Sequence, residues 1–137
     1  MEKPRLLVAG TPPAIETIRR LFGAEAVCWP ASSLDDAIRR LEAHPDAILC
    51  NVRFDESRMF ELLQYVKALP EYKEVPVICV QCMEVALADA VLKNMDDAVK
   101  ALGGTAFVDL RDHVMHFRSQ CDFLARLASQ STRFSPN

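Results

Sequence analysis

The sequence predicts a single α/β domain in which a parallel sheet is covered by helices on both faces. Short apolar runs alternate along the chain with longer segments whose apolar residues recur at helical spacing. The short runs are continuously apolar, as expected of strands that are buried on both sides. The length of 137 residues suits one domain with one core. Together these observations predict consecutive strand–helix units.

The first two strands are predicted at residues 5–10 and 24–29, and a helix follows each of them. Thr11 stands before a proline at the expected first helical position, which is a typical helix start. Ser32 or Ser33 is expected to cap the second helix, because two acidic residues follow in its first turn. The chain therefore opens with two similar strand–helix units.

A third apolar run, residues 47–50, stops at the polar residue Asn51. A loop then leads to a third amphipathic helix that ends at Pro70. Residues 75–80 and 105–108 predict the fourth and fifth strands. The fourth helix is predicted to have an apolar stripe of Ala88, Val91, Leu92, Met95, Ala98, Val99 and Leu102. The fifth helix is predicted to have an apolar stripe of Val114, Phe117, Cys121, Leu124 and Ala128.

Five strands that alternate with five helices predict right-handed crossovers and a flavodoxin-like three-layer sandwich with strand order 2-1-3-4-5. We expect the domain to span residues 1–129. Residues 130–137 are polar and aperiodic, which predicts a flexible tail. Because these elements use nearly all of the residues, we expect a complete, stand-alone protein.

Composition and charge exclude several functional classes. The formal net charge of -3 argues against binding nucleic acid through bulk charge. Arg19, Arg20, Arg39 and Arg40 are expected to lie on solvated helix faces. The chain begins without a basic and apolar leader and contains no continuous apolar stretch of membrane-spanning length. These features predict a cytoplasmic protein without membrane or nucleic-acid partners.

Ligands of an open parallel sheet bind at the carboxyl ends of its strands. Asn51 is predicted at that edge. A carboxylate there is a potential nucleophile or metal ligand, whereas an amide is neither in the ordinary sense. The predicted site therefore starts from a residue that is poorly suited to both kinds of chemistry.

Three stretches resemble a response-regulator receiver domain, and the likeness covers roughly residues 4 to 128. The first is Pro45-Asp46-Ala47-Ile48-Leu49-Cys50, followed by a polar residue, a loop and Phe60-Glu61-Leu62-Leu63. The others are the fourth-strand run that begins at Val75 and the stretch from Ala101 to Val108. The resemblance implies a fold that takes a phosphoryl group from a histidine kinase onto an aspartate, beside an acidic pair that holds Mg²⁺, a Ser or Thr hydroxyl and a lysine.

Each of those functional positions departs from the family pattern in this chain. Asn51 stands at the position of the aspartate, and Gly10 and Thr11 stand at the positions of the acidic pair. Gln81 stands at the hydroxyl position, and Leu110 or its neighbour Arg111 stands at the lysine position. Mg²⁺ prefers carboxylate oxygens, and the first three of these residues supply none. We therefore expect no metal, no cofactor and no catalysis. We also hypothesise that Thr11 bonds Asn51 across the strand ends.

The resulting prediction is a pseudo-receiver, a non-enzymatic module that signals by protein contact in a two-component, phosphorelay or related pathway. Its partner would be a kinase, another regulator or a second copy, with a homodimer through the fourth and fifth helices. The resemblance places the contact surface at Val91, Met95, Lys100, Phe107, His113 and His116.

Two alternatives remain open from the sequence. An atypical receiver could accept phosphate on a replacement acid, Asp55 or Glu56, although a solvated loop, or Asp55 capping the third helix, is favoured. A flavodoxin-like fold could also bind a small anion or nucleotide. The absence of a glycine-rich phosphate loop disfavours that alternative.

The cysteines and histidines do not form a recognisable metal or redox motif. Five cysteines are present, and Cys79 and Cys82 have C-x-x-C spacing. Cys79 is predicted inside a strand, and alternation points it away from Cys82, so both are expected to be structural thiols. His113 and His116 could share a helix face, but two ligands make a weak metal site.

Overall fold

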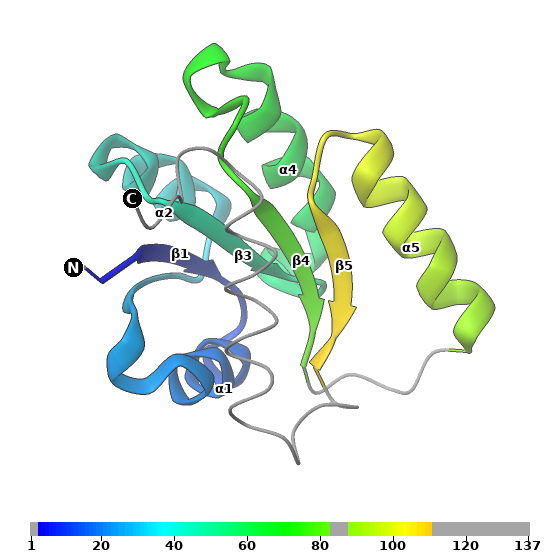
Figure 1. Cartoon of the computed structure of the whole chain (residues 1–137), viewed down its shortest axis with the longest axis horizontal. Helices are drawn as coiled ribbons and strands as arrows, with labels where there is room; N and C mark the ends of the chain where they lie inside the picture. The colour runs from blue at the N-terminus through cyan, green and yellow to red at the C-terminus, as the bar shows by residue number, and fades with distance from the viewer. Residues whose placement is uncertain (1–2, 83–87, 111–137) are drawn as a thin grey trace.

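The computed structural model describes residues 3–82 and 88–110. Within these residues, five parallel strands form one sheet of order β2-β1-β3-β4-β5, as predicted (Figure 1). The strands are β1 (Arg5–Ala9), β2 (Val27–Ala31), β3 (Ala47–Asn51), β4 (Val77–Gln81) and β5 (Ala106–Asp109).

Helices cover both faces of the sheet. In Figure 1, α1 lies on one face, and α2, α4 and α5 lie on the other side of the strands. The described helices are α1 (Pro12–Phe22), α2 (Leu34–Arg40), α4 (Met59–Ala68) and α5 (Asp89–Ala101), and α3 (Phe54–Ser57) is a single turn. The helix predicted around residues 114–128, the domain limit at residue 129 and the tail 130–137 lie outside the described residues.

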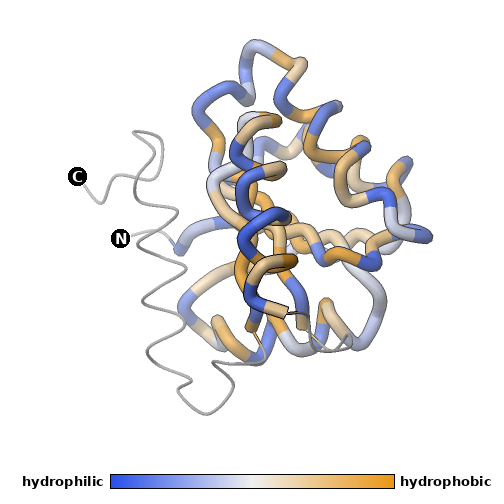
Figure 2. The backbone as a smooth tube through the Cα atoms, turned by 90° about the vertical axis from the view of Figure 1, so that its right-hand side faces the viewer, coloured by the Kyte–Doolittle hydropathy of each residue, from blue (hydrophilic) through white to orange (hydrophobic). Residues whose placement is uncertain are grey.

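Alternating side chains of each strand feed two separate hydrophobic cores. On β1, Leu6 and Val8 pack with α1, whereas Leu7 and Ala9 pack with α2 and α4. All four are buried, which explains why the strand reads as a continuous apolar run. In Figure 2, hydrophobic residues follow the central strands, and the helices alternate between hydrophobic and hydrophilic residues.

The predicted helix ends are confirmed in position. Thr11 is the N-cap residue of α1, and Ser33 is that of α2. The Ser33 Oγ accepts a hydrogen bond from Asp36 N at 3.1 Å, which satisfies one of the free donors of the helix terminus. Gly23 ends α1 with a φ of 53°, a conformation that disfavours residues with a Cβ atom.

The second strand lies later in the sequence than predicted. It begins at Val27, because residues 23–25 form a 3₁₀ turn, and it continues through Pro30 to Ala31. Val27 N donates to the Pro4 carbonyl, and Gly10 N donates to the Ala31 carbonyl. Pro30 therefore faces the open edge of the sheet, where its missing N–H group costs no hydrogen bond. A proline at this edge also discourages pairing with a further strand.

None of the helices that the structure describes is long and apolar enough to span a membrane.

Candidate functional site

Asn51 is the last residue of β3, and its side chain is fully buried, with 0% exposure. Its Nδ2 donates to the Val80 carbonyl of β4 at 3.4 Å, and its Oδ1 accepts a hydrogen bond from Arg53 N at 3.1 Å. The amide thus joins β3 to the neighbouring strand and to the loop that follows. An ionised carboxylate has no hydrogen to donate to the Val80 carbonyl. These contacts fit an amide better than the aspartate of a receiver.

Gly10 lies beside Asn51 at the end of β1. A Cβ atom at Gly10 would be 3.1 Å from the Asn51 Cβ and 3.4 Å from the Ala14 Cβ. This close approach leaves little room for the acidic side chain that the receiver resemblance implies at this position. Thr11 makes no side-chain cap hydrogen bond to α1. The hydrogen bond proposed between Thr11 and Asn51 stays a prediction.

Gln81 and Asp109 are register partners at the ends of β4 and β5. Both are buried, with 1% and 9% exposure. Within the part of the chain that the structure describes, the Nε2 atom of Gln81 has no hydrogen-bond partner. A buried donor without a partner loses its hydrogen bonds to water and gains nothing in return. The position at which the receiver resemblance implies a hydroxyl is therefore occupied here by an amide whose nitrogen is unsatisfied among the described residues.

Sequence reasoning missed Asp109. The fifth strand was predicted to end at Val108, one residue before this carboxyl group. A signal for it exists, because three adjacent strands each finish their apolar run on a polar side chain. Those side chains are Asn51, Gln81 and Asp109, and all three lie at the carboxyl edge of the sheet, where ligands of open sheets bind.

The lysine position of the receiver pattern contains no cation among the described residues. Leu110 is buried with 1% exposure and packs in the core on the α1 side of the sheet. An apolar side chain at this point contributes packing and has no charge to offset that of a phosphoryl group. Arg111, the neighbouring candidate, lies outside the described residues.

The replacement acids lie in the turn that follows Asn51. The Asp55 Oδ2 accepts a hydrogen bond from Leu34 N at 2.7 Å, at the start of α2. The prediction that Asp55 caps the third helix is therefore wrong, since the N-cap residue of α4 is Arg58 and Asp55 caps α2 instead. A partner 21 residues away was not visible in the local sequence. Glu56 is exposed.

The residues predicted to form the contact surface differ in exposure, and their role in contacts stays a prediction. Val91 is exposed at 42%, and Met95 is partly buried against the core. Lys100 is exposed and forms an ion pair with Asp96 at 2.8 Å. Phe107 was wrongly placed on this surface: it is 8% exposed and packs in the core beneath α4 and α5. The remaining two candidates, His113 and His116, lie outside the described residues.

Cys79 and Cys82 lie on opposite faces of the sheet, as predicted from strand alternation. Cys79 packs in the core on the α4 side, and Cys82 packs in the core on the α1 side. Burial raises the pKa of the Cys79 thiol to about 12, and it raises the pKa of Cys50 well above its usual value. Thiols with raised pKa values are poor nucleophiles and poor ligands at neutral pH. Among the residues that the structure describes, no three histidine, cysteine or acidic side chains gather as a metal site would require.

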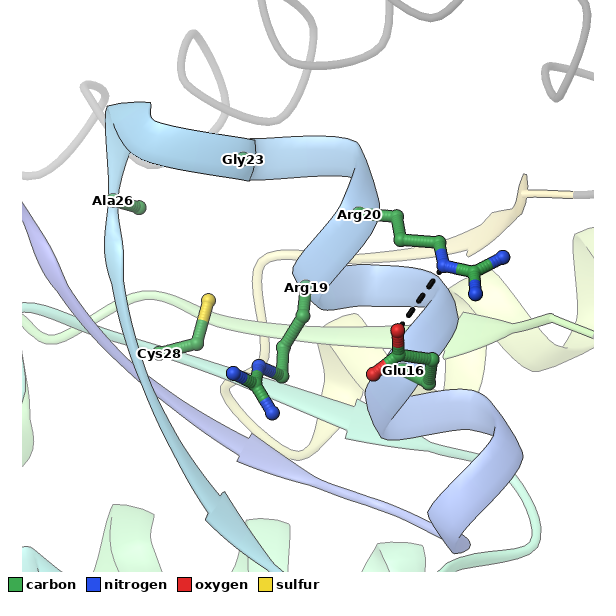
Figure 3. A pocket seen from close by; sticks show the side chains of 6 residues that line it. All are labelled: Glu16, Arg19, Arg20, Gly23, Ala26 and Cys28. Carbon is green, nitrogen blue, oxygen red and sulfur yellow. Dashed lines mark hydrogen bonds and ion pairs between the residues drawn. The ribbon is translucent and has the colours of Figure 1, made fainter.

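A shallow pocket of about 290 Å³ lies at the opposite edge of the sheet, between the end of α1 and the start of β2 (Figure 3). Glu16 and Arg20 form an ion pair across 3.1 Å, and the Arg19 side chain points toward Cys28. Burial raises the pKa of Cys28, and the nearby Arg19 only partly offsets this effect. The pocket therefore contains neither an activated thiol nor residues from the Asn51 edge.

No protein-family model matches the sequence, and no curated protein matches it. Solved structures do match the fold. A response regulator from Chloroflexus aurantiacus has a TM-score of 0.73 at 15% identity, covering 93% of this chain and 99% of that one. The signal receiver domain of a histidine kinase from Syntrophus aciditrophicus has a TM-score of 0.70 at 18% identity, covering 98% and 96%.

A third match is the phosphorylated form of a cyanobacterial phytochrome response regulator, with a TM-score of 0.72 at 14% identity, covering 96% of this chain and 98% of that one. The chain therefore has the fold of receiver domains, which is the flavodoxin-like architecture predicted from the sequence. Identities this low establish the fold alone.

Proposed function

We propose that the chain is a pseudo-receiver of the response-regulator family, a cytoplasmic module that signals through protein contacts without transferring phosphate. The observation that carries this proposal is the hydrogen bonding of Asn51. Its amide donates to one backbone group and accepts from another, and both bonds stabilise the edge of the sheet. A residue with this structural task keeps the receiver scaffold in shape without being a phosphoacceptor.

The neighbouring residues support the same conclusion. Phosphoryl transfer to a receiver needs a carboxylate nucleophile, further carboxylates for Mg²⁺ and cations to offset the developing charge. Gly10, Asn51 and Leu110 stand at three of these positions and supply none of these groups. The phosphorylated cyanobacterial regulator has the same fold. The proposed difference between this chain and a phosphorylated receiver thus lies in the side chains at the strand ends and not in the fold.

The alternative, an atypical receiver that is phosphorylated on another acid, is tested with acetyl phosphate. The purified chain is incubated with acetyl phosphate and Mg²⁺, and its intact mass is measured beside that of an active receiver as positive control. We expect no added phosphoryl group. A stable addition that disappears in Asp55→Asn or Asp109→Asn would overturn the proposal and identify the acceptor.

We also propose that one partner is a second copy, with α5 packed antiparallel against α5 of the other subunit. The exposed charges on α5 alternate in sign, in the order Asp89, Lys93, Asp97 and Lys100. An antiparallel pair would place Asp89 opposite Lys100 and Lys93 opposite Asp97. Each of these four exposed charges would then meet its opposite, which favours this orientation over a parallel one. Kinases or other regulators that carry a similar helix would fit the same face.

Light scattering after size exclusion tests the homodimer. Lys93→Glu is expected to weaken it, because a glutamate would face Asp97 of the other copy. The double change Lys93→Glu with Asp97→Lys exchanges the two charges and is expected to restore it. Arg40→Glu, on the exposed part of α2, is the matched control. A monomer at all concentrations, or equal weakening by Arg40→Glu, would refute this arrangement.

A further inference from the structure

The loop that follows Asn51 contains a backbone conformation that side chains rarely adopt. Three consecutive residues have positive φ angles, 42° at Asp55, 57° at Glu56 and 69° at Ser57, and none of them is glycine. Residues other than glycine avoid this region because the Cβ atom crowds the backbone. Such a turn persists only when the surrounding structure holds it in place.

Both ends of this turn are anchored. Before it, Arg53 N donates to the Asn51 side chain, and Phe54 is fully buried with 0% exposure. After it, Arg58 N donates to the Phe54 carbonyl at 2.7 Å, and α4 begins at the next residue. These contacts fix where the turn starts and ends, but they do not hold its middle.

The Asp55 side chain makes the contact that ties the middle of the turn to another element. Its carboxylate accepts the hydrogen bond from Leu34 N at 2.7 Å, and Arg58 lies 3.9 Å from the same oxygen. Leu34 is the first residue of α2, where free N–H groups and the helix dipole favour a negative charge. Glu56, its neighbour in the same turn, is exposed.

We propose that Asp55 is a latch. Its hydrogen bond couples the start of α2 to the loop that follows Asn51, so that the two elements are held in place or released together. Breaking the hydrogen bond leaves Leu34 N at the start of α2 without its acceptor, although Ser33 still caps Asp36 N, and at the same time removes the restraint on the strained turn. A partner that displaces the start of α2 would thereby release the loop at the Asn51 edge, and a partner at that edge would loosen α2. The latch goes beyond the proposed contact signalling and would operate even if the acceptor test found a phosphorylated acid elsewhere.

Amide hydrogen exchange of the full chain tests the latch from both sides. Asp55→Ala removes the acceptor, and Leu34→Pro removes the donor. Proline is tolerated at the first position of a helix, and the preceding Ser33 has φ -131° and ψ 157°, which suits a residue before proline. Each variant is expected to speed exchange of the Arg58 amide roughly fivefold, the effect of losing one helix cap. Asp55→Ala is also expected to expose the Leu34 amide.

The matched control is Glu56→Ala, which alters the adjacent residue of the same strained turn and is expected to leave both amides unchanged. The double variant should exchange at Arg58 no faster than either single variant, because both changes break one hydrogen bond. Faster exchange at Leu34 with an unchanged Arg58 amide would show that the two elements are uncoupled. Additive effects in the double variant, or an equal effect of Glu56→Ala, would overturn the latch in the same way.

Discussion

Asn51 and Gln81 are two buried amides at the ends of neighbouring strands, and their hydrogen bonding differs. Asn51 donates to Val80 and accepts from Arg53, so the backbone around it depends on its side chain. The Nε2 atom of Gln81 finds no partner in the described part of the chain, although it is just as deeply buried. Both residues occupy positions at which the receiver resemblance implies reactive or phosphate-binding groups.

The difference shows that a buried amide at the edge of the sheet can have two different effects on the fold. At Asn51 the amide is part of the scaffold, and Gly10 lies so close that a Cβ atom there would be 3.1 Å from the Asn51 Cβ. At Gln81 the side chain occupies the position without contributing a hydrogen bond through its buried donor. A polar residue that is buried and bonded is stabilising, whereas one that is buried and unbonded is a cost. The two positions should therefore respond to substitution with opposite signs.

Asn51→Asp is expected to have the largest effect. The carboxylate would be buried beside the Val80 carbonyl without a donor, so we expect the free energy of unfolding at pH 7 to fall by roughly 2–4 kcal/mol. Burial would raise the folded-state pKa of this new acid above its unfolded value. The penalty should then shrink at low pH, where the acid is protonated in both states, and grow as pH rises. Urea unfolding at pH 4.5 and pH 7 measures it.

Asn51→Leu is the control, because it removes both hydrogen bonds without burying a charge. The free energy of unfolding should fall less for Asn51→Leu than for Asn51→Asp, and the decrease should be independent of pH. Equal stability of Asn51→Asp and the parent chain at pH 7 would contradict the structural role of the amide. So would a rise in the unfolding midpoint of Asn51→Asp on adding Mg²⁺, because that would show an edge still able to hold a cation.

Gln81→Met is expected to change stability in the opposite direction. Methionine has a similar shape and no donor, so the substitution removes an unsatisfied group and should raise the free energy of unfolding by about 1 kcal/mol. Gln64→Met, at an exposed position on α4, is the matched control and should have no effect. Thermal unfolding of the two variants beside the parent measures the difference. A destabilised Gln81→Met would mean that Gln81 makes a stabilising hydrogen bond in solution.

Sequence reasoning identified the five strands and Asn51 because both depend on local patterns, namely apolar runs and the polar residue that ends one of them, and the alternation of strands with helices then predicted the sheet order. It misplaced features that depend on the neighbouring elements. Pro30 belongs to β2 because that strand lies at the edge of the sheet. Asp55 caps a helix 21 residues away, and Phe107 is buried because α5 covers that face. Continuous apolar strands do not reveal which face a given helix covers, so these assignments needed the fold.

Asp96 contacts β5, the strand that pairs with β4 and therefore lies next to Gln81. Its substitution should have the smallest effect on stability. Its Oδ1 accepts a hydrogen bond from Phe107 N at 2.9 Å, which occupies a backbone donor of the edge strand β5. Burial opposes ionisation of this carboxyl group, but the hydrogen bonds from Lys100 and Phe107 outweigh it and lower its pKa. Asp96 therefore stabilises the fold at neutral pH through a contact between α5 and β5.

Asp96→Asn is expected to lower the free energy of unfolding at pH 7 by less than about 1 kcal/mol, since the group is only partly shielded from water. A folded-state pKa below the unfolded value contributes stability that is present above pH of about 3.9 and is lost as pH falls through the folded value. The gap between parent and variant should therefore close in acid. Asp97→Asn, which breaks an exposed ion pair on the same helix without touching β5, is the control. Equal losses in the two variants would mean that the contact with Phe107 contributes nothing, and that the helix pair alone accounts for the effect.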